Sequence, residues 1–194
     1  KNHLKENYLS EVIQHKNLPF DIDFLAKLSN AGRLGCIVDV SQNMITDKLL
    51  SDKISLYIGN VLAKNNVSTL CVNSTPRYNL MSPLFKREKS VFRSLEEKNS
   101  SIPKDEAEIL SDKEGLLKSG NLLPIQQEFS KYDTVLLSLG SDISDLAKFK
   151  LIDKSDFFIL VGQVRKTSYE RLNKYINKTS GKDSKCIGFF LINK

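Results

Sequence analysis

Five short runs of almost uninterrupted apolar residues, separated by longer polar segments, restrict the possible folds of this chain more than any other feature. They lie at 34–40, 67–72, 134–139, 157–162 and 186–192. Strands buried on both faces read as continuous apolar runs, whereas half-exposed strands alternate between apolar and polar residues. The sequence therefore predicts a sheet that is covered on both sides.

Helical periodicity fills the segments between these runs. Residues 46–64 place Leu50 and Ile54 on one apolar face, with Thr46 as N-cap, and Asn65-Asn66 ends this helix. Further helices are expected at 122–131, 141–151 and 167–178, the last opened by the capping box Thr167-Ser168-Tyr169-Glu170. Short strand–helix–strand connections favour parallel pairing. We predict an α/β fold: a doubly wound, mostly parallel sheet of five or more strands with helices on both faces.

The domain organisation follows from the same pattern. The chain has 194 residues, enough for one ample core. Residues 1–33 are expected to form a helical segment that packs on this core, with Pro19 separating two short helices. Residues 34–194 are expected to form a single α/β domain. Within it, a polar stretch at about 84–120 has few large apolar residues, and we expect a variable, partly helical surface excursion there.

Charge and composition argue against two classes of function. The net charge is +6, but the basic residues alternate with acidic ones along the whole chain. No arginine-rich arm or aromatic RNA-binding pattern is present, so no nucleic-acid partner is expected. No apolar run approaches the roughly 20 residues that span a bilayer, so we expect no membrane span or signal peptide within these residues.

The cysteines and histidines do not form a metal site. Cys36, Cys71 and Cys186 each lie in one of the apolar runs, which is typical of reduced core residues. Both histidines, His3 and His15, lie in the N-terminal segment, and no Cys-x-x-Cys exists. We therefore expect no bound metal.

The C-terminal half resembles a known superfamily. Tyr132-Asp133-Thr134-Val135-Leu136-Leu137 looks like the run that leads into the second acidic motif of P-loop proteins of the ParA and MinD type. Leu151-Ile152-Asp153-Lys154-Ser155-Asp156, followed by an apolar strand, matches the usual succession in that superfamily. The chain looks most like the cytoplasmic domain of bacterial tyrosine kinases and exopolysaccharide-transport proteins of the Wzc and ExoP type. The resemblance implies a P-loop-like fold.

The first chemical motif of that superfamily is degenerate here. A P-loop needs glycines to wrap a phosphate, then a lysine, then a Ser or Thr for Mg²⁺. Residues 41–52 contain no glycine, and aligning 59–63 with the family's Asn-Leu-Ala helix places Ile54 at the lysine position and Ser55 at the Ser/Thr position. Lys48 and Lys53 are the remaining lysines that could reach a phosphate, with solvent-facing helix lysines as the alternative.

The acidic motifs are also replaced. The resemblance places Asn73 and Thr75 where an Asp-x-Asp pair should follow the second strand, and Ser138 where an Asp should end the third. Hydroxyls and amides are poor substitutes for carboxylates around Mg²⁺. The vestigial nucleotide-site positions are therefore Lys48, Lys53, Ser55, Asn73 and Ser138, and no residue is assigned a catalytic role.

Three functional hypotheses follow. The first is a non-catalytic, degenerate nucleotide-binding-like domain of an exopolysaccharide biosynthesis or transport protein that regulates chain length. It would act by forming homo-oligomers and docking polysaccharide-export or membrane partners. It would lie at the cytoplasmic face of the inner membrane, within a longer membrane-anchored chain. The alternatives are a ParA/MinD-like or pilus-assembly localisation ATPase that still binds nucleotide, and an active tyrosine kinase or ATPase. ATP and Mg²⁺ are expected as cofactors only in these alternatives.

Overall fold

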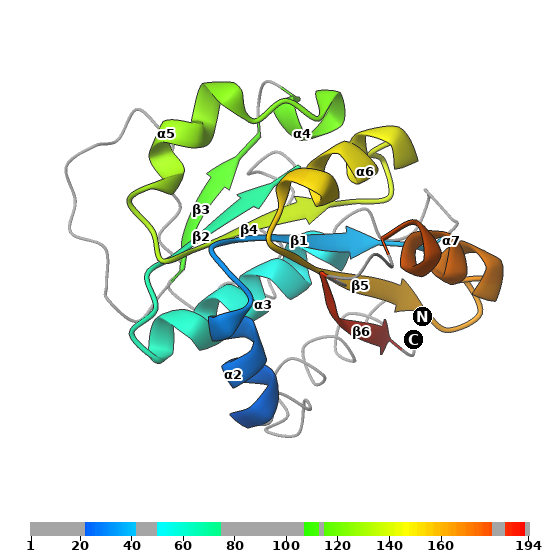
Figure 1. Ribbon diagram of the computed structural model, residues 1–194, viewed down its shortest axis with the longest axis horizontal. Helices are drawn as coiled ribbons and strands as arrows, with labels where there is room; N and C mark the ends of the chain where they lie inside the picture. The colour runs from blue at the N-terminus through cyan, green and yellow to red at the C-terminus, as the bar shows by residue number, and fades with distance from the viewer. Residues whose placement is uncertain (1–21, 42–49, 75–106, 113–114, 180–184, 193–194) are drawn as a thin grey trace, which may run out of the picture.

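A computed structural model describes residues 22–41, 50–74, 107–112, 115–179 and 185–192. Its centre is a sheet of six parallel strands in the order β3-β2-β4-β1-β5-β6 (Figure 1). The strands are β1 Leu34–Asp39, β2 Thr69–Asn73, β3 Glu108–Ser111, β4 Thr134–Leu139, β5 Phe157–Gln163 and β6 Cys186–Ile192. This arrangement confirms the predicted doubly wound, parallel α/β fold.

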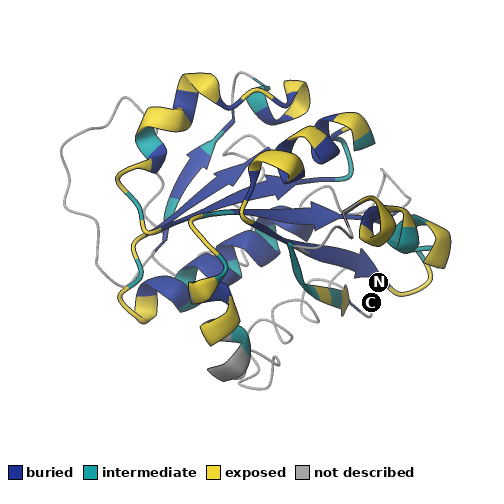
Figure 2. Ribbon diagram, viewed as in Figure 1, coloured by how far each residue is buried: buried dark blue, intermediate teal, exposed yellow. Residues whose placement is uncertain are grey.

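Helices cover both faces of the sheet (Figure 1). Helices α2 Ile22–Asn30 and α3 Leu50–Lys64 lie on one face. The other face carries α4 Leu116–Ser119, the 3₁₀ helix η3 Leu123–Ile125, α5 Gln126–Phe129, α6 Asp145–Lys154 and α7 Tyr169–Thr179. The sheet thus separates two apolar cores, and its central strands are buried along their length (Figure 2).

The α3 face is closely packed. Gly59 lies where α3 approaches β2, and a Cβ at this position would come within 2.6 Å of the Cys71 sulfur. Helix α2 contributes Leu28, which is 1% exposed, and Phe24, whose ring meets Phe190 edge-to-face at 5.5 Å. Asn66, in the left-handed conformation with φ 63°, follows the end of α3. A left-handed residue commonly terminates a helix, as the paired asparagines predicted.

Three helices differ from the expected ones in their bounds or caps. The expected helix at 122–131 is instead the 3₁₀ helix η3, with Pro124 in its first turn, followed by the short α5. Helix α6 starts at Asp145 rather than 141, with the Ser144 hydroxyl accepting a hydrogen bond from the Ala147 N–H. At α7 the cap is Ser168, which accepts from the Arg171 N–H at 3.2 Å, whereas Thr167 accepts from the Gln163 N–H.

The polar stretch at about 84–120 was expected to be partly helical, and it contains a short helix together with a strand that the sequence did not suggest. Strand β3 and helix α4 lie in it, with Ile109 only 1% exposed and Leu117 completely buried. Residues 84–106 fall outside the described part, as do Lys48, Thr46 and Thr75. Among the residues that the structure describes, no helix is long and apolar enough to cross a membrane.

Candidate functional site

The topology singles out the carboxyl end of β1. Strand β1 leads toward α3 on one face of the sheet, while its neighbour β4 leads to α6 on the other face. Where two adjacent strands send their connections to opposite faces, a crevice opens at their carboxyl ends, and ligands of doubly wound proteins bind there. The candidate site is therefore built from the ends of β1, β2 and β4 and the start of α3.

Polar side chains line this region between the sheet and α3. We call them the polar layer: Asp39, Ser51, Asp52, Ser55, Asn73 and Ser138, each 0% exposed. The strand members occupy the alternating positions that face α3, as Ile37 and Leu136 do nearer the amino ends of β1 and β4. The core beneath α3 is thus apolar at the amino half of the sheet and polar at the carboxyl half.

Two residues implied by the family resemblance contact each other directly. The Ser138 hydroxyl donates a hydrogen bond to the Asn73 side-chain oxygen at 3.0 Å and lies 3.5 Å from the backbone oxygen of Ser51. Parallel pairing of β2 with β4 brings the two side chains together, because Val72 lies opposite Leu137. Each residue therefore satisfies part of the other's hydrogen-bonding capacity.

Other atoms of the polar layer lack such partners. The hydroxyls of Ser51 and Ser55 and the side-chain nitrogen of Asn73 are buried without a hydrogen bond. Of the lysines assigned to the nucleotide site, Lys53 is half-exposed on α3 and Lys48 lies outside the described residues. Hence Ser55, Asn73 and Ser138 lie in one buried layer, whereas Lys53 is only partly buried.

A buried lysine approaches the end of β1 from the opposite face. Lys148 of α6 is 0% exposed, and its Nζ donates to the backbone oxygen of Asp39 at 2.6 Å. Burial lowers the pKa of Lys148 to about 8, although the carboxylate charge of Asp39 favours the ammonium. Such a group is costly to bury and often marks a functional position.

Asp39 completes this feature. Its carboxylate accepts hydrogen bonds from the backbone N–H of Ser41, at 2.8 Å, and from the Ser41 hydroxyl. Burial raises the pKa of Asp39, and the Ser41 hydrogen bonds and the Lys148 charge oppose that rise.

The sequence analysis did not identify Asp39 or Lys148 as site residues, although the sequence contains a signal for each. Asp39 is the one acid in an apolar run, and Lys148 lies three and four residues before Leu151 and Ile152, on the buried face of α6.

Helix α6 is in turn fixed to α7 through Asp145. This carboxylate accepts from Arg171 at 3.1 Å, Lys174 at 2.7 Å and the Tyr175 hydroxyl at 2.6 Å. Partial burial by itself would raise the pKa of Asp145, but these hydrogen bonds and positive charges outweigh burial and lower it. The connection holds the helix that carries Lys148 in place.

Two positions at which the family resemblance expects carboxylates for Mg²⁺ carry neutral side chains in this structure. A hard dication prefers several carboxylate oxygens, and phosphoryl transfer needs a lysine and a metal placed against the phosphate. Where those carboxylates are needed, the structure has the amide of Asn73 and the hydroxyl of Ser138, already bonded to each other. Across the described ranges, no three His, Cys, Asp or Glu side chains gather in a way that could hold a metal ion.

Comparison with known proteins identifies a fold and no sequence family. Neither any protein-family description nor any curated protein matches the sequence. Eleven chains of solved structures do match. One is the crystal structure of the VpsO kinase domain, with a TM-score of 0.60 over 100% of this chain and 98% of that one. This chain has the fold of the VpsO kinase domain.

The likeness to VpsO is one of architecture. At 16% sequence identity it shows the fold and leaves the chemistry of the site to be argued from the residues. It covers the whole chain, and it agrees with the resemblance of the sequence to bacterial tyrosine kinase domains. The P-loop-like fold is thereby shown.

Proposed function

We propose that this chain is a non-catalytic domain with the fold of a bacterial tyrosine kinase domain, and that it works through protein contacts. In this proposal it belongs to an exopolysaccharide biosynthesis or transport system. It forms homo-oligomers and docks export or membrane partners at the cytoplasmic face of the inner membrane. The fold shared with the VpsO kinase domain supports the general kind of protein.

One observation supports the loss of catalysis above the others. Asn73 and Ser138 occupy the positions at which the family resemblance expects metal-binding carboxylates, and they are completely buried and bonded to each other. At these two positions a Mg²⁺ ion would have to break this hydrogen bond and would gain only an amide and a hydroxyl oxygen in return. Ser55 alone matches a family position, and its hydroxyl cannot hold a metal by itself.

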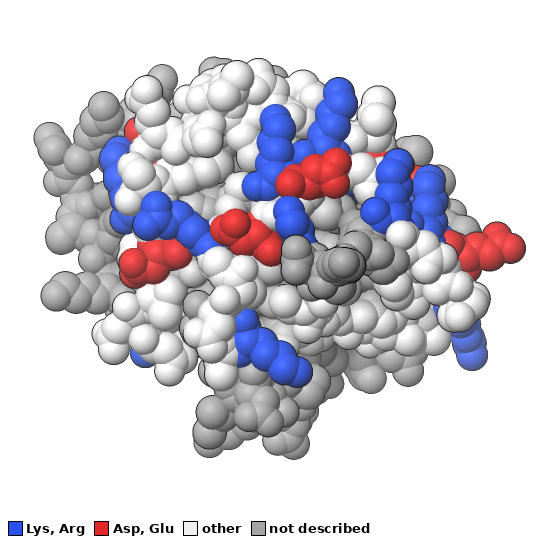
Figure 3. Space-filling model, viewed as in Figure 1, with Lys and Arg blue, Asp and Glu red and all other residues white. Residues whose placement is uncertain are grey.

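The surface charge supports protein partners over nucleic acid. On the face drawn in Figure 3, basic side chains stand next to acidic ones rather than in a patch of one sign. Lys118 pairs with Asp142, and Lys131 pairs with Glu128. A nucleic-acid surface would instead gather its basic residues along one face.

Titration calorimetry with ADP and ATP, each with and without Mg²⁺, tests the proposal. We expect no binding heat up to near-millimolar nucleotide, and no phosphate release or tyrosine phosphorylation on prolonged incubation with ATP and Mg²⁺. The VpsO kinase domain, handled identically, is the control for the assay. Micromolar, Mg²⁺-dependent binding would overturn the proposal that the domain works through protein contacts alone, and phosphate release or tyrosine phosphorylation would overturn its non-catalytic part.

A second candidate is a nucleotide-binding switch of the ParA/MinD type without efficient hydrolysis. It is favoured by the polar atoms of Ser51, Ser55 and Asn73 that are buried without partners, since such atoms often mark a place where a ligand or water binds. The same calorimetry distinguishes the two, because a switch requires nucleotide affinity. Mutation Ser55→Ala should then weaken that affinity, whereas the first proposal predicts no effect on it.

A further inference from the structure

In the part of the chain that the structure describes, the strand at one edge of the sheet lacks the usual protection against pairing with another strand. Within the described residues, β6 pairs with β5 alone. Its sequence from Cys186 to Ile192 contains no charged residue and no proline. Edge strands normally carry lysines, prolines or covering elements that prevent association with a second sheet edge. An edge of seven uncharged residues is therefore suited to a partner.

The side chains of β6 expose apolar area beside this edge. Phe189 is 38% exposed and Leu191 is 54% exposed, and both point to the α7 face of the sheet. On the other face, Phe190 packs against Phe24 and Ile192 is 8% exposed. The uncovered area thus belongs to two alternate residues on one face of the strand.

The same two residues present their backbone groups to the open side. The backbone oxygen of Ile192 accepts a hydrogen bond from the Val164 N–H, which follows β5, at 3.0 Å. The backbone groups of Ile192 therefore point toward β5, and so do those of Phe190, two positions earlier. Because N–H and C=O groups of a strand point alternately to its two sides, Phe189 and Leu191 face outward. Pairing of β6 with β5 is irregular between Phe158 and Ile159, opposite Ile187, so the regular edge spans 188–192 with Phe190 at its centre.

We propose that two copies of this chain pair antiparallel through their β6 edges, around a two-fold axis at Phe190. In this register Phe189 of each copy lies opposite Leu191 of the other, and each such pair exchanges two backbone hydrogen bonds. The two most exposed apolar side chains of the strand then cover one another. The strand is self-complementary, as a two-fold interface requires, and no charge enters the interface. The pairing does not depend on whether nucleotide binds.

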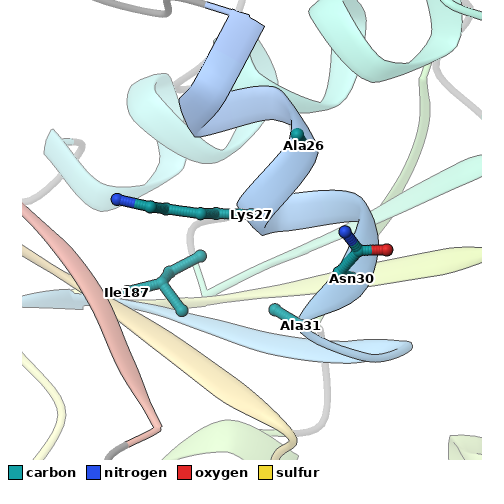
Figure 4. Close-up of a pocket in the computed structure, with 5 residues that line it drawn as sticks. All are labelled: Ala26, Lys27, Asn30, Ala31 and Ile187. Atoms are coloured by element: carbon teal, nitrogen blue, oxygen red, sulfur yellow. The ribbon is translucent and has the colours of Figure 1, made fainter.

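A groove at the other end of β6 marks the limit of this surface. Ala26, Lys27, Asn30 and Ala31 of α2 and the connection after it line the groove together with Ile187, and its volume is about 530 Å³ (Figure 4). It lies toward the amino ends of the strands, away from the polar layer. Ile187 is also the residue at which the pairing of β6 with β5 becomes irregular. The groove therefore begins where the regularly paired part of β6 ends.

Sedimentation analysis across micromolar to submillimolar concentrations tests the pairing. We expect a monomer–dimer equilibrium that ends at the dimer, because each β6 edge is used once. Mutation Leu191→Lys should weaken association by at least about tenfold, since a lysine must then be buried opposite Phe189 of the other copy. Leu123→Lys is the matched control, because Leu123 is 73% exposed on η3, on another part of the surface, and should leave the dimer intact.

Disulfide trapping tests the register without relying on a charged variant. In a Cys186→Ser background, equal amounts of Phe189→Cys and Leu191→Cys proteins should form a mixed disulfide dimer faster than either forms one alone. Cys36 and Cys71 are buried and do not compete. A monomer at every concentration, assembly that grows beyond a dimer, or equal trapping in all three samples would overturn the proposal.

Discussion

Ser55 and Ser138 lie in the same polar layer, yet their replacement should have opposite effects on stability. The Ser55 hydroxyl is buried without a hydrogen bond, so Ser55→Ala removes a desolvated group and should raise the free energy of unfolding by about 1 kcal/mol. The Ser138 hydroxyl donates to Asn73, so Ser138→Ala leaves a buried acceptor unpaired and should lower it by about 1–3 kcal/mol. Urea unfolding of both variants at neutral pH measures the difference. Destabilisation by Ser55→Ala would mean that this hydroxyl has a partner, such as a buried water.

The buried ammonium of Lys148 should make stability depend on alkaline pH. Its pKa is lowered from 10.5 to about 8, so between these values the unfolded chain binds a proton that the folded chain does not. Stability contributed by this group therefore rises with pH across that interval, by about 2–3 kcal/mol in total. Lys148→Met, which retains length without charge, should abolish this rise. Denaturant unfolding at pH 8 and at pH 10 provides the comparison.

The control for Lys148→Met is Lys150→Met, on the exposed side of the same helix. Its free energy of unfolding should depend on pH in the same way as that of the unmodified protein. Burial raises the pKa of Cys36 and of Cys71 to about 12, so both thiols lower stability as the pH rises above their ordinary value near 9. These two contributions are the same in all three proteins. The difference between Lys148→Met and the unmodified chain therefore isolates the lysine, and identical pH profiles would contradict the lowered pKa.

At the level of single residues, part of the candidate site could be predicted from the sequence. Asn73 and Ser138 follow apolar strand runs, and parallel strands bring their carboxyl ends to one edge, so their proximity follows from the family alignment. The contact between Lys148 and Asp39 joins a helix on one face to a strand end 109 residues earlier. No local pattern specifies that pairing, and it appears only when the helix has been placed.

Among the elements, the buried strands were predicted best. The expected bounds of β4 and β6 agree with the structure, because each strand is a short, mostly apolar run bounded by polar residues. Strand β3 was missed because it has four residues, with Ile109 and Leu110 as its apolar pair in a polar stretch. Helix starts were less accurate, since Ser, Thr and Asp residues at 141–145 and 167–168 offer several possible caps and packing selects one.

The connection between α6 and α7 depends on one carboxylate. Asp145→Asn retains size but removes the charge that binds Arg171 and Lys174, and we expect the free energy of unfolding to fall by about 1–2 kcal/mol at pH 7. Because the pKa of Asp145 is lowered in the folded state, its contribution is present above the ordinary Asp pKa and is lost as the pH falls through the folded value. The difference between variant and parent should therefore shrink in acid unfolding measurements. Glu170→Gln, an exposed change on α7, is the control, and a difference that stays constant down to pH 2 would contradict the assignment.

For the whole molecule, the question is whether this fold can bind a metal when carboxylates are placed at the two positions where the family resemblance expects them. The double variant Asn73→Asp, Ser138→Asp would place two buried carboxylates where the present oxygens are 3.0 Å apart. Like charges at that distance cannot both ionise without large cost, so the variant should lose several kcal/mol at pH 7. Its pKa values would be raised in the folded state, so part of that stability should return as the pH falls toward 4.

The effect of Mg²⁺ on the double variant tests whether the destabilised layer can bind a metal. If the layer is closed to ligands, as its complete burial indicates, millimolar Mg²⁺ should leave the thermal midpoint of the double variant unchanged within a degree or so. The two single variants, which lack the carboxylate pair, control for nonspecific ion effects. A Mg²⁺-dependent rise confined to the double variant would show that the fold retains a metal site from which two side chains are missing. The proposed lack of catalysis would then depend on those two residues rather than on the closed packing between α3 and the sheet.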